Sequence, residues 1–92
     1  EVEARIDRGL QVLHVAAETR QILSNMAHVL DAAGSSLAKV VKVNVLIYSM
    51  LEYENMNSVY REFFPTDPPA RTVCGVKLIG GHKVEIECIA LA

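Results

Sequence analysis

Hydrophobic residues recur at every third or fourth position in the first third of the chain. From Ala16 onward they form one continuous stripe, which is typical of the buried face of an amphipathic helix. Gly34 follows the last position of the stripe, where a glycine in the left-handed conformation commonly ends a helix. The stripe consists of Ile22, Leu23, Met26, Ala27, Leu30 and Ala33.

The first 15 residues carry an ambiguous pattern. Val2, Ile6, Leu10 and Leu13 fit a helical stripe, but the apolar run over residues 9–15 fits a strand equally well. Periodicity alone does not decide between the two for so short a run. We expect a strand at residues 10–15.

Residues 40–48 alternate as a β-strand does. Val41, Val43, Val45 and Ile47 fall on one face, which is fully apolar and is expected to meet the helices. The other face mixes polar and apolar side chains, as an interface or a partly wetted surface would.

A second helix is predicted after Ser49, a good N-cap residue. It must end by Phe64, because Pro65 and the later prolines cannot continue it. Asn57 lies in its middle, where a solvent-facing polar residue is one interpretation. The predicted apolar stripe contains Leu51, Met56, Val59, Tyr60 and Phe63.

Two further strands are predicted at residues 72–79 and 82–91, joined through Gly80-Gly81, which is a strong hairpin signal. A tight turn there would place Arg71 and Glu85 on opposite faces, unless a bulge or a second subunit intervenes. It would also separate Cys74 from Cys88, which argues against a disulfide within the chain. The pattern as a whole predicts an α+β domain with two helices on one face of a mainly antiparallel sheet.

Length and charge limit the possible functions. A chain of 92 residues (1–92) is expected to form a single domain, and oligomerisation would add to its limited buried surface. A net charge of −2 without a basic cluster argues against nucleic-acid partners. No apolar run approaches the roughly 20 residues of a membrane span, and no signal peptide is evident.

The cysteines and histidines point to no metal site. Cys74 and Cys88 lie in strand-like runs, which favours reduced thiols in the cytosol or in mitochondria. The three histidines share no metal-ligand spacing, so we expect no bound metal.

The candidate chemistry is concentrated near the C-terminus. Arg71 follows Pro68-Pro69 at the start of a predicted strand, and Glu85 and Glu87 lie on the next one. The arginine side chain matches a carboxylate bidentately, and a half-buried glutamate can act as a base or hold a water molecule. The alternative is a surface salt bridge that contributes little.

Several segments in this order resemble the RidA/YjgF family of reactive intermediate deaminases, over residues 16–92. The segments are Gln21–Met26, Val29–Leu37, Val40–Val43, Met56–Tyr60, Phe63-Phe64, Pro69–Arg71 and Val84–Glu87.

The resemblance implies a chorismate-mutase-like α+β fold and a homotrimer with ligand clefts between its subunits. It implies hydrolysis of 2-imino and 2-enamine acids, such as 2-iminobutanoate and 2-iminopropanoate, to 2-oxo acids and ammonia without a cofactor. Arg71 would bind the substrate carboxylate, and Glu85 would position or activate the water. Asn57 and Cys74 would line the cleft, whereas Glu87 would be structural.

The chain also departs from the family. The usual N-terminal segments, Gly-Pro-Tyr-Ser-Gln-Ala and Ser-Gly-Gln, do not occur in it, so it resembles a shortened member with a divergent start. We therefore expect it to bind 2-oxo acids weakly and to hydrolyse imines slowly or not at all. The second hypothesis is a trimeric ligand-binding or interaction module without appreciable turnover.

Overall fold

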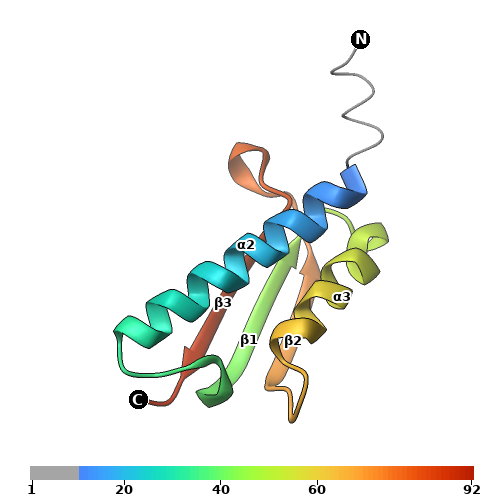
Figure 1. Ribbon diagram of the computed structural model, residues 1–92. Coiled ribbons are helices and arrows are strands. Elements are labelled where there is room, and N and C mark those ends of the chain that lie inside the picture. Colours follow the sequence, from blue (N-terminus) through green and yellow to red (C-terminus); the bar gives the residue numbers. More distant parts are fainter. Residues whose placement is uncertain (1–10) are drawn as a thin grey trace.

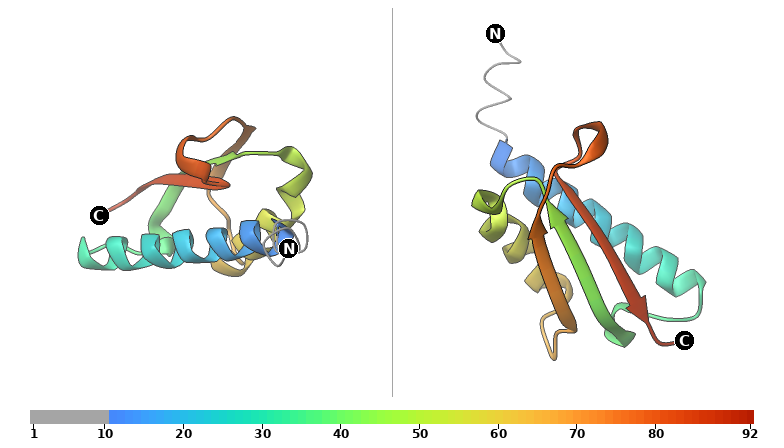
Figure 2. Two further views of the ribbon diagram at one scale, coloured as in Figure 1. Left: turned by 90° about the horizontal axis from the view of Figure 1, so that it is seen from above. Right: turned by 180° about the vertical axis from the view of Figure 1, so that it is seen from behind.

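Two helices lie against one face of a three-stranded sheet in the computed structural model of the protein, which describes residues 11–92 (Figures 1 and 2). Three single-turn 3-10 helices occupy connections between these elements. In chain order the main elements are α2 (Gln11–Ala32), β1 (Val40–Ile47), α3 (Tyr53–Phe63), β2 (Ala70–Gly75) and β3 (Val84–Ala90). The expected α+β fold with both helices on one face is confirmed.

Strand β1 is the central strand of the sheet. The strand order is β2-β1-β3, with β1 parallel to β2 and antiparallel to β3, so the sheet is mixed. The expected hairpin between the last two strands is therefore wrong. Gly80 and Gly81 do both adopt a φ of 74°, as turn glycines can, but they lie in a projecting connection rather than between paired strands.

The buried face of β1 matches the expectation at three positions of four. Val43, Val45 and Ile47 are fully buried against the helices. The strand register shifts between Val40 and Lys42, where a bulge breaks the alternation. As a result Val40 is only 7% exposed, whereas Val41 is 44% exposed and does not face the core as predicted.

The expected strand at residues 10–15 is also wrong where the structure describes it. Gln11 to Val15 form the first turns of α2, while Leu10 lies outside the described residues. Val15 is fully buried, so it extends the buried stripe of the helix. The neighbouring turn buries Thr19, whose hydroxyl donates to the Val15 carbonyl oxygen at 2.7 Å.

The C-terminal end of α2 follows the sequence-based prediction. Gly34 has a φ of 81°, and its amide donates to the Asp31 carbonyl at 3.0 Å. The Ser35 amide donates to the Leu30 carbonyl at 2.8 Å, which completes a glycine-ended helix terminus.

Helix α3 begins after a 3-10 turn at Met50–Glu52, whose N-cap is Ser49. The Ser49 hydroxyl accepts from the Leu51 amide at 3.2 Å, whereas Leu51 itself is exposed and does not join the core as predicted. Met56, Tyr60 and Phe64 pack into the core with the strand valines.

We expect the buried face of α2 to contribute strongly to the stability of the fold. Leu23 is fully buried, so Leu23→Ala should lower the free energy of unfolding by about 2–5 kcal/mol. Val29, on the same helix, is 67% exposed, and Val29→Ala should change that free energy by less than about 0.5 kcal/mol. Urea unfolding of both variants tests this, and equal losses would contradict the packing described for α2.

Candidate anion-binding site

Arg71 is the second residue of β2 and projects toward the helices. It pairs with Val43 of β1, whose side chain is buried on the helix-covered face. Successive residues of a strand alternate between faces, so the arginine and Val43 share that face. Pro68 and Pro69, just before the strand, have fixed φ angles and stiffen the approach to Arg71.

The Arg71 guanidinium group is held by three side chains of α3 and its start. Its Nη1 donates to Asn57 Oδ1 at 2.6 Å, and its Nη2 donates to the Tyr53 hydroxyl at 2.7 Å. The Tyr60 ring centroid lies 4.6 Å from the guanidinium carbon, within cation–π range. Asn57 is only 8% exposed, so its solvent-facing interpretation is wrong.

All of these partners are neutral, so the charge of Arg71 is not compensated within the described chain. Among residues 11–92 the one ion pair joins Arg20 to Glu62, at 2.8 Å and exposed to solvent. Each terminal nitrogen of a guanidinium carries two N–H donors, and the two bonds described use one on each. The remaining donors and the positive charge are suited to an anion such as a carboxylate.

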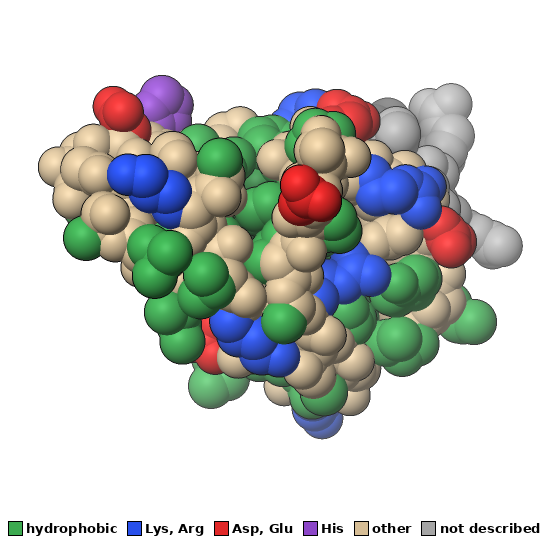
Figure 3. Space-filling model, turned by 90° about the horizontal axis from the view of Figure 1, so that it is seen from below, with side chains coloured by type: hydrophobic (Ala, Val, Ile, Leu, Met, Phe, Trp, Pro, Cys, Tyr) green, Lys and Arg blue, Asp and Glu red, His purple; other side chains and the backbone are tan. Residues whose placement is uncertain are grey.

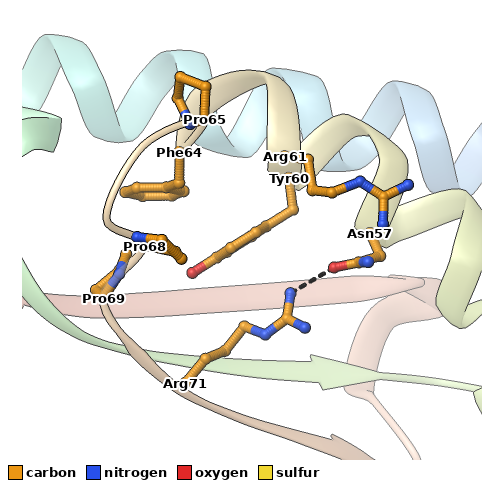
Figure 4. A pocket seen from close by; sticks show the side chains of 8 residues that line it. All are labelled: Asn57, Tyr60, Arg61, Phe64, Pro65, Pro68, Pro69 and Arg71. Carbon is orange, nitrogen blue, oxygen red and sulfur yellow. Dashed lines mark hydrogen bonds between the residues drawn. The ribbon is translucent and has the colours of Figure 1, made fainter.

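A cavity of about 460 Å³ opens beside this guanidinium (Figure 4). Helix α3 and its C-cap residue contribute side chains spaced i, i+3, i+4 and i+7, which share one helix face. The connection to β2 contributes prolines, and the apolar walls strengthen electrostatic interactions inside. The lining residues are Asn57, Tyr60, Arg61, Phe64, Pro65, Pro68, Pro69 and Arg71. Figure 3 views the molecule from below, where hydrophobic side chains are exposed together with several basic and acidic ones.

The hydroxyl groups of Tyr60 and Tyr53 differ in their hydrogen bonding. The Tyr60 hydroxyl is buried in the cavity wall and has no hydrogen-bond partner within the described part of the chain. Burial raises the pKa of this phenol, the Cys88 thiol raises it further, and the Arg71 charge acts in the opposite direction. The group therefore stays protonated at neutral pH.

Glu85 and Cys74 lie on the other face of the sheet, away from Arg71. Both pair with Leu46 of β1, so the three residues form one row across the open face. The expected opposition of Arg71 and Glu85 holds, although it arises from pairing with β1 and not from a hairpin. Glu87 shares this face, and its Oε1 accepts from Asn44 Nδ2 at 3.0 Å.

The four predicted site residues thus separate into two pairs. Arg71 and Asn57 meet on the helix side, whereas Cys74 and Glu85 lie on the open side. Both cysteines are free, and Cys88 pairs with Val43 on the buried face, so their predicted separation is confirmed.

Sequence reasoning did not identify Tyr53 or the role of the Tyr60 ring in the site. Their spacing carried a signal, because Tyr53, Asn57 and Tyr60 follow one another at i, i+4 and i+7. Within residues 11–92 no cluster of three histidine, cysteine or acidic side chains is placed to hold a metal ion. No helix in this range combines the length and hydropathy needed to cross a membrane.

Comparison with known proteins identifies the family. The family model described as endoribonuclease L-PSP matches residues 5–92. The chain therefore belongs to this family, that of the RidA and YjgF proteins, as the sequence resemblance predicted.

Curated relatives share between a third and a half of their aligned residues with the chain. The mitochondrial protein mmf1 of Schizosaccharomyces pombe is 47% identical over 81 residues, which cover 84% of this chain and 50% of that protein. The human 2-iminobutanoate/2-iminopropanoate deaminase is 36% identical over 78 residues, covering 84% of this chain and 57% of that protein. The chain thus spans about half the length of these relatives.

Solved structures of family members have the same fold. Yeast Mmf1 superposes with a TM-score of 0.81 at 36% identity, covering 84% of this chain and 62% of that one. RidA from the Antarctic bacterium Psychrobacter superposes with a TM-score of 0.77 at 33% identity, covering 80% of this chain and 61% of that one.

The two tyrosines allow a matched test of how Arg71 is held. Tyr53→Phe removes an acceptor that Arg71 uses, so it should lower the free energy of unfolding by about 1–2 kcal/mol. Tyr60→Phe removes a buried hydroxyl without a described partner and keeps the ring, so it should raise that free energy by about 1 kcal/mol. Urea unfolding of both variants measures the difference, and equal destabilisation would show that the Tyr60 hydroxyl has a partner after all.

Proposed function

We propose that the protein hydrolyses 2-imino and 2-enamine acids to 2-oxo acids and ammonia. The observation that carries the proposal is Arg71, a half-buried arginine with only neutral partners beside an apolar-walled cavity. Such a group favours the carboxylate that all of these substrates possess. Relatives at 36–38% identity from human and cattle are named 2-iminobutanoate/2-iminopropanoate deaminases, which supports the reaction class.

In the proposed reaction Arg71 binds the substrate carboxylate, while Asn57 and Tyr53 fix the orientation of its guanidinium group. Water adds to the imine carbon, the carbon–nitrogen bond then breaks, and ammonia leaves as the 2-oxo acid forms. Glu85 takes a proton from the attacking water and returns one to the departing nitrogen, so the step needs no oxidant, reductant or cofactor. Cys74 lines the cleft in which this proposed reaction takes place.

Arg71 and Glu85 do not face a common ligand within one chain. They lie on opposite faces of one sheet, so a cleft that uses both must include more than one chain. We propose a homotrimer in which clefts between subunits combine residues of the two faces.

The second candidate is a ligand-binding module with little or no turnover. The separation of Arg71 from Glu85 favours this candidate, because Arg71, Asn57 and the cavity form a binding site that does not include Glu85. The description of the family as an endoribonuclease is a weaker guide here, since the net charge of −2 does not favour RNA as a ligand.

We further propose that the protein works in the cytosol or in mitochondria. Its two cysteines are free thiols, as in a reducing compartment. Two Schizosaccharomyces pombe relatives are named as mitochondrial proteins, which supports the second location.

The reaction is tested by supplying 2-iminopropanoate from a pyridoxal-phosphate enzyme and following 2-oxo acid release. We expect release to be only modestly faster than the spontaneous rate, and Glu85→Gln should return it to that rate, since loss of a general base typically costs about 10²–10⁴-fold. Arg71→Lys keeps the charge but loses the paired donors, so it should weaken 2-oxobutanoate binding by about 2–4 kcal/mol.

Glu87→Gln is the matched control, because Glu87 shares the strand and face of Glu85 but is bonded to Asn44. It should leave turnover within about twofold. Binding through Arg71 without any acceleration would favour the module over the enzyme. Turnover that survives Glu85→Gln would place water activation on another group.

The proposed trimer is tested separately. Cys74, Glu85 and Ile89 are exposed on the open sheet face, which no helix covers (Figure 2). Light scattering at micromolar concentration should give about three times the 10.1 kDa chain mass. Subunit interfaces of this kind typically bury roughly 1,200–2,000 Å² each. A monomer mass would remove the basis for a shared cleft.

A further inference from the structure

We propose that Arg61 is a second anion-recognising residue of the Arg71 cavity and makes it selective for ligands with two acidic groups. The ligands favoured would be 2-imino and 2-oxo dicarboxylic acids, in preference to alkyl monocarboxylic acids. The identification of the ligand as a 2-imino acid rests on the proposed function. The selectivity between one and two carboxylates does not.

Arg61 reaches the cavity from the helix side. It lies four residues after Asn57 on α3, so the two share one face of the helix. Both line the cavity, together with Arg71, which approaches from the sheet. Figure 4 shows Arg61 on the helix side of Asn57 and Arg71 on the strand side. The cavity is therefore lined by two arginines on separate elements, and their guanidinium groups lie on either side of the Asn57 side chain.

No acidic side chain balances these charges at the cavity. None of its eight lining residues is a carboxylate, and neither arginine forms an ion pair with the part of the chain that the structure describes. Glu62 follows Arg61 directly, but both of its carboxylate oxygens accept from Arg20, at 2.8 and 3.1 Å. The carboxylate nearest to Arg61 along the sequence is thus already engaged. Asp67, four residues before Arg71, forms no ion pair among residues 11–92 and lines a neighbouring cavity.

This local charge is opposite in sign to that of the whole chain. The chain has 11 acidic and 9 basic residues, yet this cavity has two basic ones and no acidic one. Two like charges at one apolar-walled site repel each other, and a ligand with two negative charges removes that repulsion while it pairs with each. A monocarboxylate would satisfy Arg71 and leave Arg61 unpaired.

The cavity also has room for the longer ligand. Its volume of about 460 Å³ lies within the roughly 300–1,000 Å³ usual for small-molecule sites. Arg61 is exposed, so we expect its contribution to be moderate and to weaken with salt.

The test compares the binding of 2-oxobutanoate and 2-oxopentanedioate by calorimetry at low salt. The parent should bind the dicarboxylate about three- to tenfold more tightly. Arg61→Gln should abolish that preference and leave 2-oxobutanoate affinity within about twofold, and Arg61→Glu should reverse the preference. Lys77→Gln is the matched control, because it removes one exposed positive charge beyond the far end of β2 and should preserve the preference.

The outcomes separate this proposal from the proposed function. A parent without dicarboxylate preference, or an Arg61→Gln variant that loses affinity for both acids equally, would overturn the role of Arg61. A parent that shows the preference, lost in Arg61→Gln and kept in Lys77→Gln, supports that role even if imine hydrolysis is never detected. Failure of the hydrolysis assay alone would count only against the enzymatic proposal.

Discussion

Strand β1 is hydrogen-bonded along both of its edges, and the position of the site follows from this constraint. Its pairing with β2 is parallel, so the chain must cross from the end of β1 back to the start of β2. Helix α3 makes that crossing and packs on the sheet face that also receives Arg71 (Figure 1). The parallel pairing thereby brings Tyr53, Asn57 and Tyr60 over the arginine, from positions 11 to 18 residues earlier in the chain.

The way Arg71 is held explains why its charge remains available. A carboxylate partner would fix the side chain equally well but would also neutralise it. Asn57, Tyr53 and the Tyr60 ring instead offer two neutral acceptors and an aromatic face, which stabilise a partly buried cation and leave its net charge unchanged. The guanidinium group is thus oriented before any ligand arrives, which reduces the ordering cost of binding. The same absence of a carboxylate extends to Arg61 across the cavity.

The sequence predicted the elements whose signals are local. The stripe that ends at Gly34 and the alternation of Val43, Val45 and Ile47 both reflect the burial of one face, and both proved right. The family resemblance led to Arg71 and Asn57, which the structure joins by a hydrogen bond.

The errors concern the partner of each strand, which no local signal contains. Gly80-Gly81 has the conformation of turn glycines, but the apolar β1 pairs with both later strands and separates them. The bulge near Val41 has no residue signature that alternation reveals. Cys74 stands three residues from Arg71, and an odd separation on a strand reverses the face, so the two residues can share a cleft only in the proposed assembly.

Strand parity has a consequence for function that no side-chain rotation can change. Arg71 and Glu85 are kept on opposite faces by the backbone pairing of β1, so their two proposed roles, carboxylate binding and water activation, do not meet within one described chain. Each described residue that lines the Arg71 cavity belongs to α3, β2 or their connection. In the proposed assembly, affinity is therefore a property of the single chain, whereas turnover is a property of the trimer.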